Sequence, residues 1–294
     1  MQVDVAFITV NYNTCALVEE LIRFFKAVEL PFSYCLVVVD NNSTDGSQEM
    51  LQHEAWDGLR YIQTRENLGY GRGMNRGLQA VSSRYACIMN TDLILNQEAL
   101  SALWSFLNST PSAGVASPVI LGSNQRIQSF IFNPGVVLLY LPWLGKMLSK
   151  LRKLQVHYSR KPVEVPGVMG AFFVIRRSCF KSESLFDEDF FFYFEDAELA
   201  NRLFKQKILS YVLPQVSIIH TGGQSTSENG GRLFYESKQI YINKCHGADH
   251  LKAIKKLDNI RILFKFVKYL FLVRIVRSEK VSGKFMYYSR LVRK

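Results

Sequence analysis

Apolar runs of strand length alternate with segments of helical spacing through the first half of the chain. Residues 4–10 (DVAFITV) and 34–39 (YCLVVV) are mostly apolar and rich in β-branched residues, as strands of a parallel sheet buried on both faces are. The apolar positions between these runs repeat at the spacing of one helix face: Leu17, Val18, Leu21, Ile22 and Phe25. A strand, a helix and a second strand in this order predict a βαβ unit with a right-handed crossover.

The same alternation continues along the chain, with less regular spacing after Pro111. Helices are predicted over residues 15–29, 46–54, 73–81, 97–107 and 195–206. Further strands are predicted over residues 59–63, 85–89, 114–120, 168–176 and 209–213. This order predicts an α/β fold class, with a mostly parallel central sheet flanked by helices.

Composition permits a well-packed core and argues against a disulfide scaffold. With 294 residues, 48% of them hydrophobic, the chain suffices for one large α/β domain with an appendage or for two modest domains. The five cysteines stand singly without a C-x-x-C pair, which disfavours zinc and disulfide frameworks and indicates a reducing compartment. A strand-like run begins at Val3, so we expect no signal peptide and a cytoplasmic location.

The net charge of +11 is concentrated at one end of the chain. Residues 246–294 hold thirteen Lys or Arg residues against Asp249, Asp258 and Glu279, a net charge of +10. Residues 1–245 are therefore close to neutral, and the C-terminal segment is the basic part of the protein.

The second predicted strand ends in a polar run, DNNSTDGS (40–47). Ligands of open parallel sheets bind at the carboxyl ends of the strands, so these side chains are candidate ligand contacts. A turn and a helix N-cap are sufficient to explain residues 43–47. Asp40 comes before any cap position, where its carboxylate can accept hydrogen bonds from a base or a ribose.

A glycine cluster, ENLGYGRGMNRGL (66–78), follows the third strand. It does not fit the dinucleotide-binding fingerprint, because position 76 is an arginine and the turn is not the first of the sheet. A flexible loop is one interpretation. The functional interpretation is that three glycines let the backbone approach a ligand: Gly69, Gly71 and Gly73. Arg72 and Asn75 would then present polar groups to that ligand.

The run YACIMNTDLIL (85–95) turns polar at Asn90-Thr91-Asp92 and returns to apolar residues without a glycine or a proline. A plain polar turn is one explanation. Mg²⁺ and Mn²⁺ are often held by one or two protein ligands while substrate phosphates supply the rest. A single carboxylate at a strand end is therefore also consistent with a metal–diphosphate site.

The segment DEDFFFYFEDAELANRLFK (187–205) joins an aromatic run to two acidic residues. Phe190–Phe194 are predicted to be core. Glu195 and Asp196 begin a helix, where the helix dipole favours carboxylates, or they supply a general base whose pKa is raised by an aromatic wall. In SIIHTGGQS (217–225), His220 stands in a loop of small residues, as either a structural residue or a ligand.

Together these segments resemble the inverting glycosyltransferases of family 2, which have the GT-A nucleotide-diphospho-sugar transferase fold. The resemblance covers about residues 3–245 and rests on seven ordered motifs: ITVNYN, VVVDNNSTDGS, ENLGYGRGMNRGL, MNTDLIL, VPGVMGAFFVIRR, FDEDFFFYFEDAELANRL and HTGGQS. The forms NLGYGRGMNRG and FFFYFEDAELANR are most similar to bacterial rhamnosyltransferases that act in cell-surface polysaccharide assembly.

The resemblance implies a donor site and a catalytic base. The implied donor-binding residues are Val10, Asn11, Asp40, Asn67, Arg72, Asn75, Asn90 and Asp92. Asp92 matches the last residue of the D-x-D metal motif, and His220 matches a histidine that joins the metal or the diphosphate. Asp196 matches the catalytic base, with Glu195 beside it. Asn90 replaces the first aspartate of the motif, which leaves one carboxylate for Mg²⁺ or Mn²⁺.

The implied reaction transfers a sugar, L-rhamnose from dTDP-rhamnose, to a lipid-linked saccharide acceptor with inversion at the anomeric carbon. A family 2 transferase with a UDP-sugar donor is the alternative. A nucleotidyltransferase of similar fold is disfavoured, because no glycine-rich basic loop follows the first strand. A non-catalytic nucleotide-sugar-binding domain stays open because of Asn90. A nucleic-acid-binding module fits the apolar residues of the basic tail poorly, so no nucleic-acid partner is expected.

Residues 259–277 (NIRILFKFVKYLFLVRIVR) contain five basic residues, too many for a membrane span. Arg261, Lys265 and Lys268 share one helix face, while the aromatic residues fall largely elsewhere. This pattern predicts an amphipathic helix in the interface of an anionic membrane. A C-terminal helix packed on the domain with solvated lysines is the alternative.

A second candidate membrane patch, residues 136–154 (VVLLYLPWLGKMLSKLRKL), is apolar and then basic. We expect a GT-A glycosyltransferase domain over residues 1–245. The basic helical extension, residues 246–294, would then hold the protein on the inner face of the cytoplasmic membrane.

Overall fold

The computed structural model describes residues 2–128, 135–180, 184–222, 230–275 and 278–292. The strands of this described part form one sheet: β1 (Val3–Asn11), β2 (Tyr34–Asp40), β3 (Leu59–Gln63), β4 (Ser83–Met89), β5 (Leu93–Ile94), β6 (Ala113–Gly122), β7 (Val163–Val165), β8 (Phe172–Arg176) and β9 (Leu209–His220). Its helices are α1 (Cys15–Ala27), α2 (Ser47–His53), α3 (Tyr70–Gln79), α4 (Gln97–Ser109), α5 (Val136–Tyr140), α6 (Pro142–Tyr158), α7 (Glu195–Lys205), α8 (Gly230–His246), α9 (Ala248–Ile275) and α10 (Glu279–Val292).

The sheet is parallel in its first half and mixed in its second half. Its order is β3-β2-β1-β4-β8-β6-β9-β5, and β7 pairs with β9. Strands β3, β2, β1 and β4 run parallel, β8 lies antiparallel between β4 and β6, and β6 and β9 are parallel again. The carboxyl ends of the first four strands therefore meet at one edge, which is where a ligand site is expected.

Alternate residues of the buried strands enter two separate apolar cores. Val5 and Phe7 of β1 lie in one core and Ala6 and Ile8 in the other, because successive side chains of a strand point to opposite faces. Helices α1, α2 and α4 pack on the first core, and α3, α6 and α7 pack on the second. The predicted α/β architecture is confirmed.

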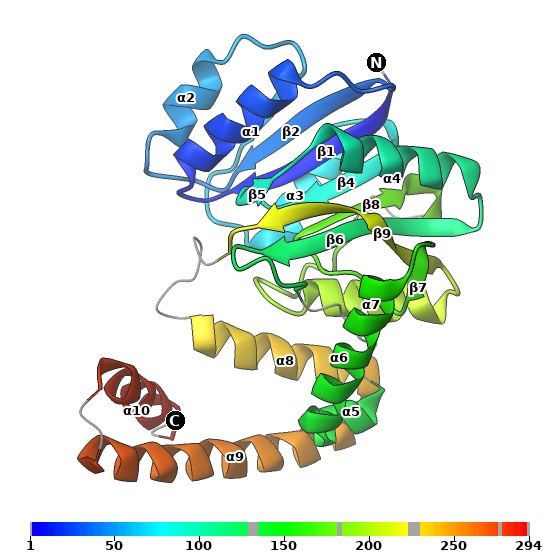
Figure 1. Cartoon of the computed structure of the whole chain (residues 1–294). Coiled ribbons are helices and arrows are strands. Elements are labelled where there is room, and N and C mark those ends of the chain that lie inside the picture. Colours follow the sequence, from blue (N-terminus) through cyan, green and yellow to red (C-terminus); the bar gives the residue numbers. More distant parts are fainter. Residues whose placement is uncertain (1, 129–134, 181–183, 223–229, 276–277, 293–294) are drawn as a thin grey trace.

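The C-terminal helices lie beside the sheet domain and extend away from it (Figure 1). A third small core joins α8 and the start of α9 to the segment before α7: Phe190, Tyr241, Ile242 and Ile254. Helix α10 folds back along α9, where Phe266 stacks on Phe285 and Tyr269 on Tyr288. Within the described part of the chain, every helix is too short or too polar to cross a membrane.

Three predicted elements differ from the structure by three or more residues at one end. The strand predicted over residues 168–176 is β8 and starts only at Phe172. The helix predicted over residues 73–81 is α3 and starts at Tyr70, so it includes most of the glycine cluster. The strand predicted over residues 209–213 continues to His220 as β9. The pairing of β9 with β6 shifts between Leu213 and Ser217, because Pro214 cannot donate a ladder hydrogen bond and is accommodated in an irregularity.

Candidate active site

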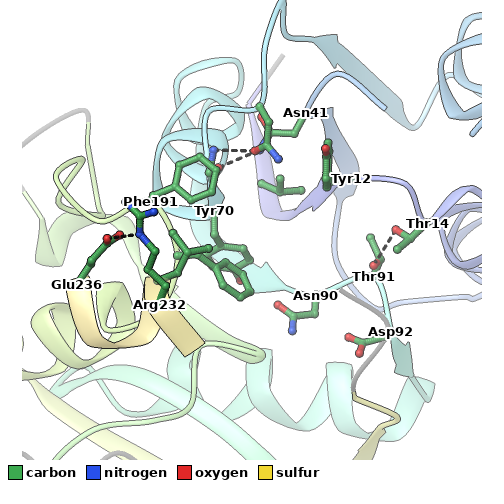
Figure 2. Close-up of a pocket in the computed structure, with 15 residues that line it drawn as sticks. Tyr12, Thr14, Asn41, Tyr70, Asn90, Thr91, Asp92, Phe191, Arg232 and Glu236 are labelled. Atoms are coloured by element: carbon green, nitrogen blue, oxygen red, sulfur yellow. Dashed lines mark hydrogen bonds and ion pairs between the residues drawn. The ribbon is translucent and has the colours of Figure 1, made fainter. Parts of the chain in front are cut away.

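A cavity of about 480 Å³ opens at the carboxyl ends of β1, β2 and β4 (Figure 2). The sheet and its following turns contribute Val10, Tyr12, Thr14, Asn41, Asn67, Gly69, Tyr70, Asn90, Thr91 and Asp92. The rest of the lining is Phe191, Phe192, Arg232, Leu233 and Glu236. Aromatic walls with a few convergent polar groups are typical of small-molecule sites. Of the predicted donor-binding residues, Val10, Asn67, Asn90 and Asp92 line this cavity.

Asn41, the first residue after β2, ties that strand to the glycine loop. Its Nδ2 donates to Oδ1 of Asn67 at 3.1 Å and to the carbonyl of Gly69 at 2.9 Å. Gly69 has a φ of +82°, and a Cβ there would lie 2.3 Å from the carbonyl oxygen of Phe191. The backbone N–H of Tyr70 donates to that same carbonyl at 2.9 Å. This wall of the cavity therefore requires glycine at position 69.

Asp40 and Asn11 lie behind the lining and are fully buried. Nδ2 of Asn11 donates to Oδ1 of Asp40 at 2.6 Å, and the backbone N–H of Ser43 donates to Oδ2 of Asp40 at 3.0 Å. The hydroxyl of Thr14 donates to Oδ1 of Asn11 at 2.6 Å. The structure therefore does not place these two side chains in the cavity as predicted. They hold the ends of β1 and β2 together, and Asn41 reaches the cavity instead.

Arg72 and Asn75 also lie outside the lining, so the geometry gives no support to their predicted placement along the donor. Nε of Arg72 donates to the carbonyl of Glu188 at 3.0 Å, on the exposed side of α3. The buried Asn75 accepts from the backbone N–H groups of Leu185 and Phe186, each at 3.0 Å, and donates to the carbonyl of Phe186 at 2.9 Å. Both side chains fix the segment that leads to α7.

Two glycines of the cluster serve helix packing and do not approach a ligand. A Cβ at Gly73 would lie 2.8 Å from Cγ2 of Val10, and one at Gly71 would lie 3.2 Å from Cβ of Phe186. Their absence of side chains lets α3 pack closely on β1 and on the segment before α7. Of the three glycines predicted to approach a ligand, Gly69 alone lines the cavity.

Asp92, His220 and Asn90 converge from the end of β9 and the turn after β4. Nε2 of His220 lies 3.1 Å from Oδ1 of Asp92 and 3.3 Å from Nδ2 of Asn90. Burial acts to raise the pKa of Asp92, but its hydrogen bond to His220 and the nearby imidazole charge lower the pKa overall. A carboxylate kept ionised beside an imidazole nitrogen is a suitable pair of ligands for a divalent cation.

Gln128 fixes the orientation of the His220 ring. Nε2 of Gln128 donates to the carbonyl of His220 at 3.1 Å, so its Oε1 faces Nδ1 of His220 at 2.8 Å as the acceptor. Nδ1 therefore carries a proton, and Nε2 points to Asp92. Nε2 is therefore the ring nitrogen that can bind a cation, and it lies beside the Asp92 carboxylate. The site thus fits a metal held by one carboxylate and one imidazole.

In the described ranges, no group of three or more His, Cys, Asp or Glu side chains gathers into a metal site. Asp92 and His220 are the two side chains here that could hold a cation. A cation bound here needs further oxygen ligands, which substrate phosphates can supply.

Arg232 and Glu236, on the first turns of α8, line the cavity opposite the sheet (Figure 2). Nε of Arg232 lies 2.6 Å from Oε1 of Glu236. The sequence analysis did not select them, because an arginine and a glutamate four residues apart are typical of any exposed helix. The packing of α8 on the aromatic segment before α7 brings them to the cavity, and this packing leaves no local signal in the sequence.

Glu195 and Asp196 occupy the first turn of α7 in different environments. Glu195 is 7% exposed, its Oε2 has no hydrogen-bond partner in the described structure, and burial together with the charge of Asp196 raises its pKa to about 8. Asp196 is partly exposed and accepts from the backbone N–H of Gly170 at 3.1 Å. Burial also raises the pKa of Asp196. Asp196 is therefore the carboxylate of the pair that is accessible from solvent.

Tyr70 separates Asp196 from the main cavity. Its ring lines the cavity and its hydroxyl donates to the carbonyl of Gly170 at 3.0 Å, while the N–H of Gly170 binds Asp196. Burial, followed by the charges of Glu195, Asp196 and Asp92, raises the pKa of Tyr70. Asp92 and Tyr70 line the cavity, whereas Gly170 and Asp196 lie behind the Tyr70 ring.

The aromatic run before α7 was predicted to lie wholly in the core, but only part of it does. Phe190 is fully buried, whereas Phe191 is 42% exposed and lines the cavity with Phe192. Tyr193 and Phe194 have positive φ values of 70° and 67°, and this left-handed turn directs consecutive rings to different sides. The run therefore supplies both a core residue and an aromatic wall.

The chain is similar to proteins that act on sugars. It is 27% identical over 236 residues to the N-acetylglucosaminyl-diphospho-decaprenol L-rhamnosyltransferase of Mycobacterium tuberculosis, covering 74% of this chain and 75% of the relative. In structure it resembles the mannosyltransferase PcManGT from Pyrobaculum calidifontis in complex with GDP-Man and Mn²⁺. That match has a TM-score of 0.57 and 14% identity, and covers 100% of this chain and 81% of PcManGT.

It also resembles GalNAc-T7, solved with UDP, GalNAc and Mn²⁺, with a TM-score of 0.58 and 14% identity. That match covers 82% of this chain and 48% of GalNAc-T7, so this chain spans about half the length of that structure. These likenesses establish the GT-A fold. The family model for glycosyl transferase family 2 matches residues 6–182, more than half of the sequence. The strand-end cavity, the fold and this match lead to one conclusion: the chain belongs to glycosyl transferase family 2, and it is a glycosyltransferase.

Proposed function

We propose that this glycosyltransferase moves L-rhamnose from dTDP-rhamnose to a lipid-linked saccharide, with inversion at the anomeric carbon, in the assembly of a bacterial surface polysaccharide. The observation that carries the proposal is a strand-end cavity lined by Asp92, with His220 3.1 Å from that carboxylate and a partly exposed Asp196 linked through Gly170 to Tyr70 of the lining. The choice of sugar and acceptor rests on the similarity to the mycobacterial rhamnosyltransferase.

The nucleotide end of the donor has a suitable binding region near Tyr12, Asn41 and Asn67. Tyr12 is an exposed aromatic ring just after β1, and Asn67 lies in the same lining, held there by the Nδ2 donor of Asn41. A base can stack on the ring while amides contact its polar edge.

The diphosphate would lie between Asp92 and Arg232, which line the cavity from the sheet and from α8 (Figure 2). Mg²⁺ or Mn²⁺ held by Asp92 and His220 would neutralise negative charge on the departing diphosphate as a Lewis acid. Arg232 can exchange its bond to Glu236 for bidentate contacts with phosphate oxygens.

Asp196 is the proposed general base. Its raised pKa brings it closer to neutral pH, where proton transfer from the acceptor hydroxyl is favoured. Removal of that proton lets the hydroxyl oxygen attack the anomeric carbon from the side opposite the diphosphate, and the bond to the diphosphate breaks. One displacement inverts the configuration, so no second carboxylate nucleophile is needed. Glu195 stays buried beside Asp196, and its pKa of about 8 favours its protonated form at neutral pH.

We propose that residues 246–294 bind the inner face of the cytoplasmic membrane, where a lipid-linked acceptor would lie. The exposed apolar residues of α9 repeat along one helix face: Ile260, Leu263, Phe264, Val267, Phe271 and Ile275. Lys268 borders this face, and Arg274 lies within it. Arg261 differs from the prediction, because its guanidinium donates to the carbonyl of Tyr140 at 2.7 Å and so holds α9 to α5.

A panel of nucleotide-sugars tests the donor assignment. Purified protein with Mg²⁺ or Mn²⁺ is incubated with dTDP-rhamnose, UDP-hexoses and GDP-mannose, and both donor hydrolysis and protection against thermal unfolding are measured. We expect protection and turnover with dTDP-rhamnose, abolished by a chelator. If only UDP-sugars give protection and turnover, the donor is a UDP-sugar and not dTDP-rhamnose. Protection without any turnover on a polyprenyl-diphospho-saccharide acceptor would indicate a non-catalytic binding domain.

A further inference from the structure

Helix α6 carries an exposed apolar stripe that no part of the described chain covers. The stripe residues recur every three or four positions along one face: Trp143, Met147, Leu151, Leu154 and Tyr158. Trp143 is 63% exposed and Tyr158 is 77% exposed. The opposite face is anchored, because Val156 is fully buried in the second core. The helix is therefore held on the domain with its apolar side facing outward.

The surroundings of this stripe are strongly basic. Between residues 136 and 163 the sequence has no Asp or Glu and has six basic residues: Lys146, Lys150, Arg152, Lys153, Arg160 and Lys161. Lys146 and Lys150 are exposed and lie one turn apart beside the apolar stripe. Because residues 1–245 are close to neutral as a whole, this helix is a local concentration of positive charge outside the tail.

We propose that α6 docks on an anionic lipid bilayer and forms a second membrane attachment, separate from α9. Aromatic and aliphatic side chains on one face with lysines beside them match a helix that lies in the headgroup region. Lysine stems can extend their ammonium groups to lipid phosphates while the stripe enters the acyl boundary. A second copy of the chain is a poorer partner, because it would bring the same cations together and lysine is depleted from protein interface cores.

The position of α6 relative to the tail supports two attachments that act together. Helix α5 directly precedes α6 and is fixed to α9, since the hydroxyl of Tyr140 lies 3.0 Å from Nδ1 of His250 and Arg261 donates to the Tyr140 carbonyl. Figure 1 shows α5 and α6 meeting the part of α9 nearest the domain. Binding at one helix therefore brings the other near the same bilayer and raises its effective concentration there. Two attachments also fix the orientation of the cavity relative to the membrane.

This inference rests on the proposed membrane-bound acceptor, but its test does not depend on turnover. Trp143 is a built-in probe, because Trp56 and Trp104 pack against the first core and Trp143 is exposed. The full-length protein is mixed with vesicles of phosphatidylcholine alone or with added phosphatidylglycerol. We expect a blue shift of the emission and quenching by brominated lipid only with the anionic vesicles. Trp143→Phe should remove both signals while vesicle binding persists.

Two double variants measure the contribution of α6 to binding. Met147→Ser with Leu151→Ser, and Lys146→Glu with Lys150→Glu, should each lower the vesicle partition coefficient about tenfold or more. Phe204→Ser is the control for the first, since Phe204 is an exposed aromatic residue on α7. Arg76→Glu with Lys205→Glu makes the same charge change as the second at exposed positions elsewhere. Both controls should bind as the wild type does.

The inference is overturned if the tryptophan emission is unchanged on anionic vesicles, or if the double variants bind as well as their controls. It is also overturned if the stripe mediates lipid-free dimerisation that Met147→Ser with Leu151→Ser abolishes. Donor turnover with a water-soluble acceptor analogue is measured on the same samples. If vesicle binding depends on α6 but no turnover is seen, the proposed function is refuted and this inference stands. If turnover is normal but vesicle binding does not depend on α6, only this inference is refuted.

Discussion

The buried carboxyl group of Glu195 should make the folded protein less stable as the pH rises. Its pKa is raised from 4.5 to about 8, first by burial and then by the charge of Asp196. Between these two pH values, the unfolded chain loses the Glu195 proton while the folded chain keeps it. The free energy of unfolding therefore falls as the pH rises through this window. The loss due to Glu195 reaches its full size once the pH exceeds about 8.

The structure sets the size of this effect. At about 1.4 kcal/mol per pH unit, a pKa raised from 4.5 to about 8 corresponds to roughly 5 kcal/mol of unfolding free energy lost across the window. Glu195→Gln removes the titration. The amide of the new glutamine would occupy the site where Oε2 of Glu195 has no hydrogen-bond partner, and it would also stay unpaired. This lowers the free energy of unfolding by about 1–3 kcal/mol at every pH. The variant is thus expected to be less stable than wild type at pH 5 and more stable at pH 9.

Thermal unfolding followed by circular dichroism at pH 5, 7 and 9 measures this crossover. The melting temperature of Glu195→Gln minus that of wild type should rise by about 10 °C from pH 5 to pH 9, at about 2–4 °C per kcal/mol. Glu20→Gln, a change at an exposed carboxylate on α1, is the matched control and should show no such rise. Parallel pH profiles of Glu195→Gln and wild type would refute the argument that Glu195 is buried without a partner.

Three further predictions concern the proposed chemistry. A Cβ at Gly170 would lie 2.9 Å from Cβ of Asp196, so Gly170→Ala should displace that carboxylate and lower kcat about tenfold or more, while calorimetry shows unchanged donor binding. Gln128→Leu should weaken Mn²⁺ binding about 10–100-fold in a metal titration, because the His220 ring loses its fixed orientation, and unchanged affinity would contradict the assigned tautomer. Arg232→Gln should raise the donor Kd about tenfold or more, whereas Arg72→Gln, outside the cavity, should leave it near wild type.

Seven of the nine described strands, and the helices between the first of them, were predictable because a parallel sheet buried on both faces leaves continuous apolar runs in the sequence. Strands β5 and β7 are too short to leave such a run. Those runs also located the strand ends, and with them Val10, Asn67, Asn90 and Asp92 in the lining of one cavity. The order of the later strands was not predictable. Strand β8 enters antiparallel between β4 and β6, and nothing in its own apolar sequence distinguishes that pairing from a parallel one.

At the end of β2, Asp40 was the predicted ligand contact, whereas its neighbour Asn41 lines the cavity. A carboxylate and an amide that follow a strand are both plausible ligand contacts, and the direction of each side chain decides between them. Asp40 turns inward to Asn11 and Ser43, whereas Asn41 reaches the cavity. Arg232 was not predictable at all, because α8 is far along the chain from the other lining residues and reaches the cavity only through tertiary packing.

Asp196→Asn tests the central claim most directly. Turnover of dTDP-rhamnose on a polyprenyl-diphospho-saccharide acceptor is measured for wild type and variant, together with donor binding by calorimetry. We predict a loss of about 10²–10⁴-fold in kcat with the donor Kd nearly unchanged, because the carboxylate acts only on the acceptor proton. Turnover near the wild-type rate in Asp196→Asn, with an intact fold and normal donor binding, would contradict the account.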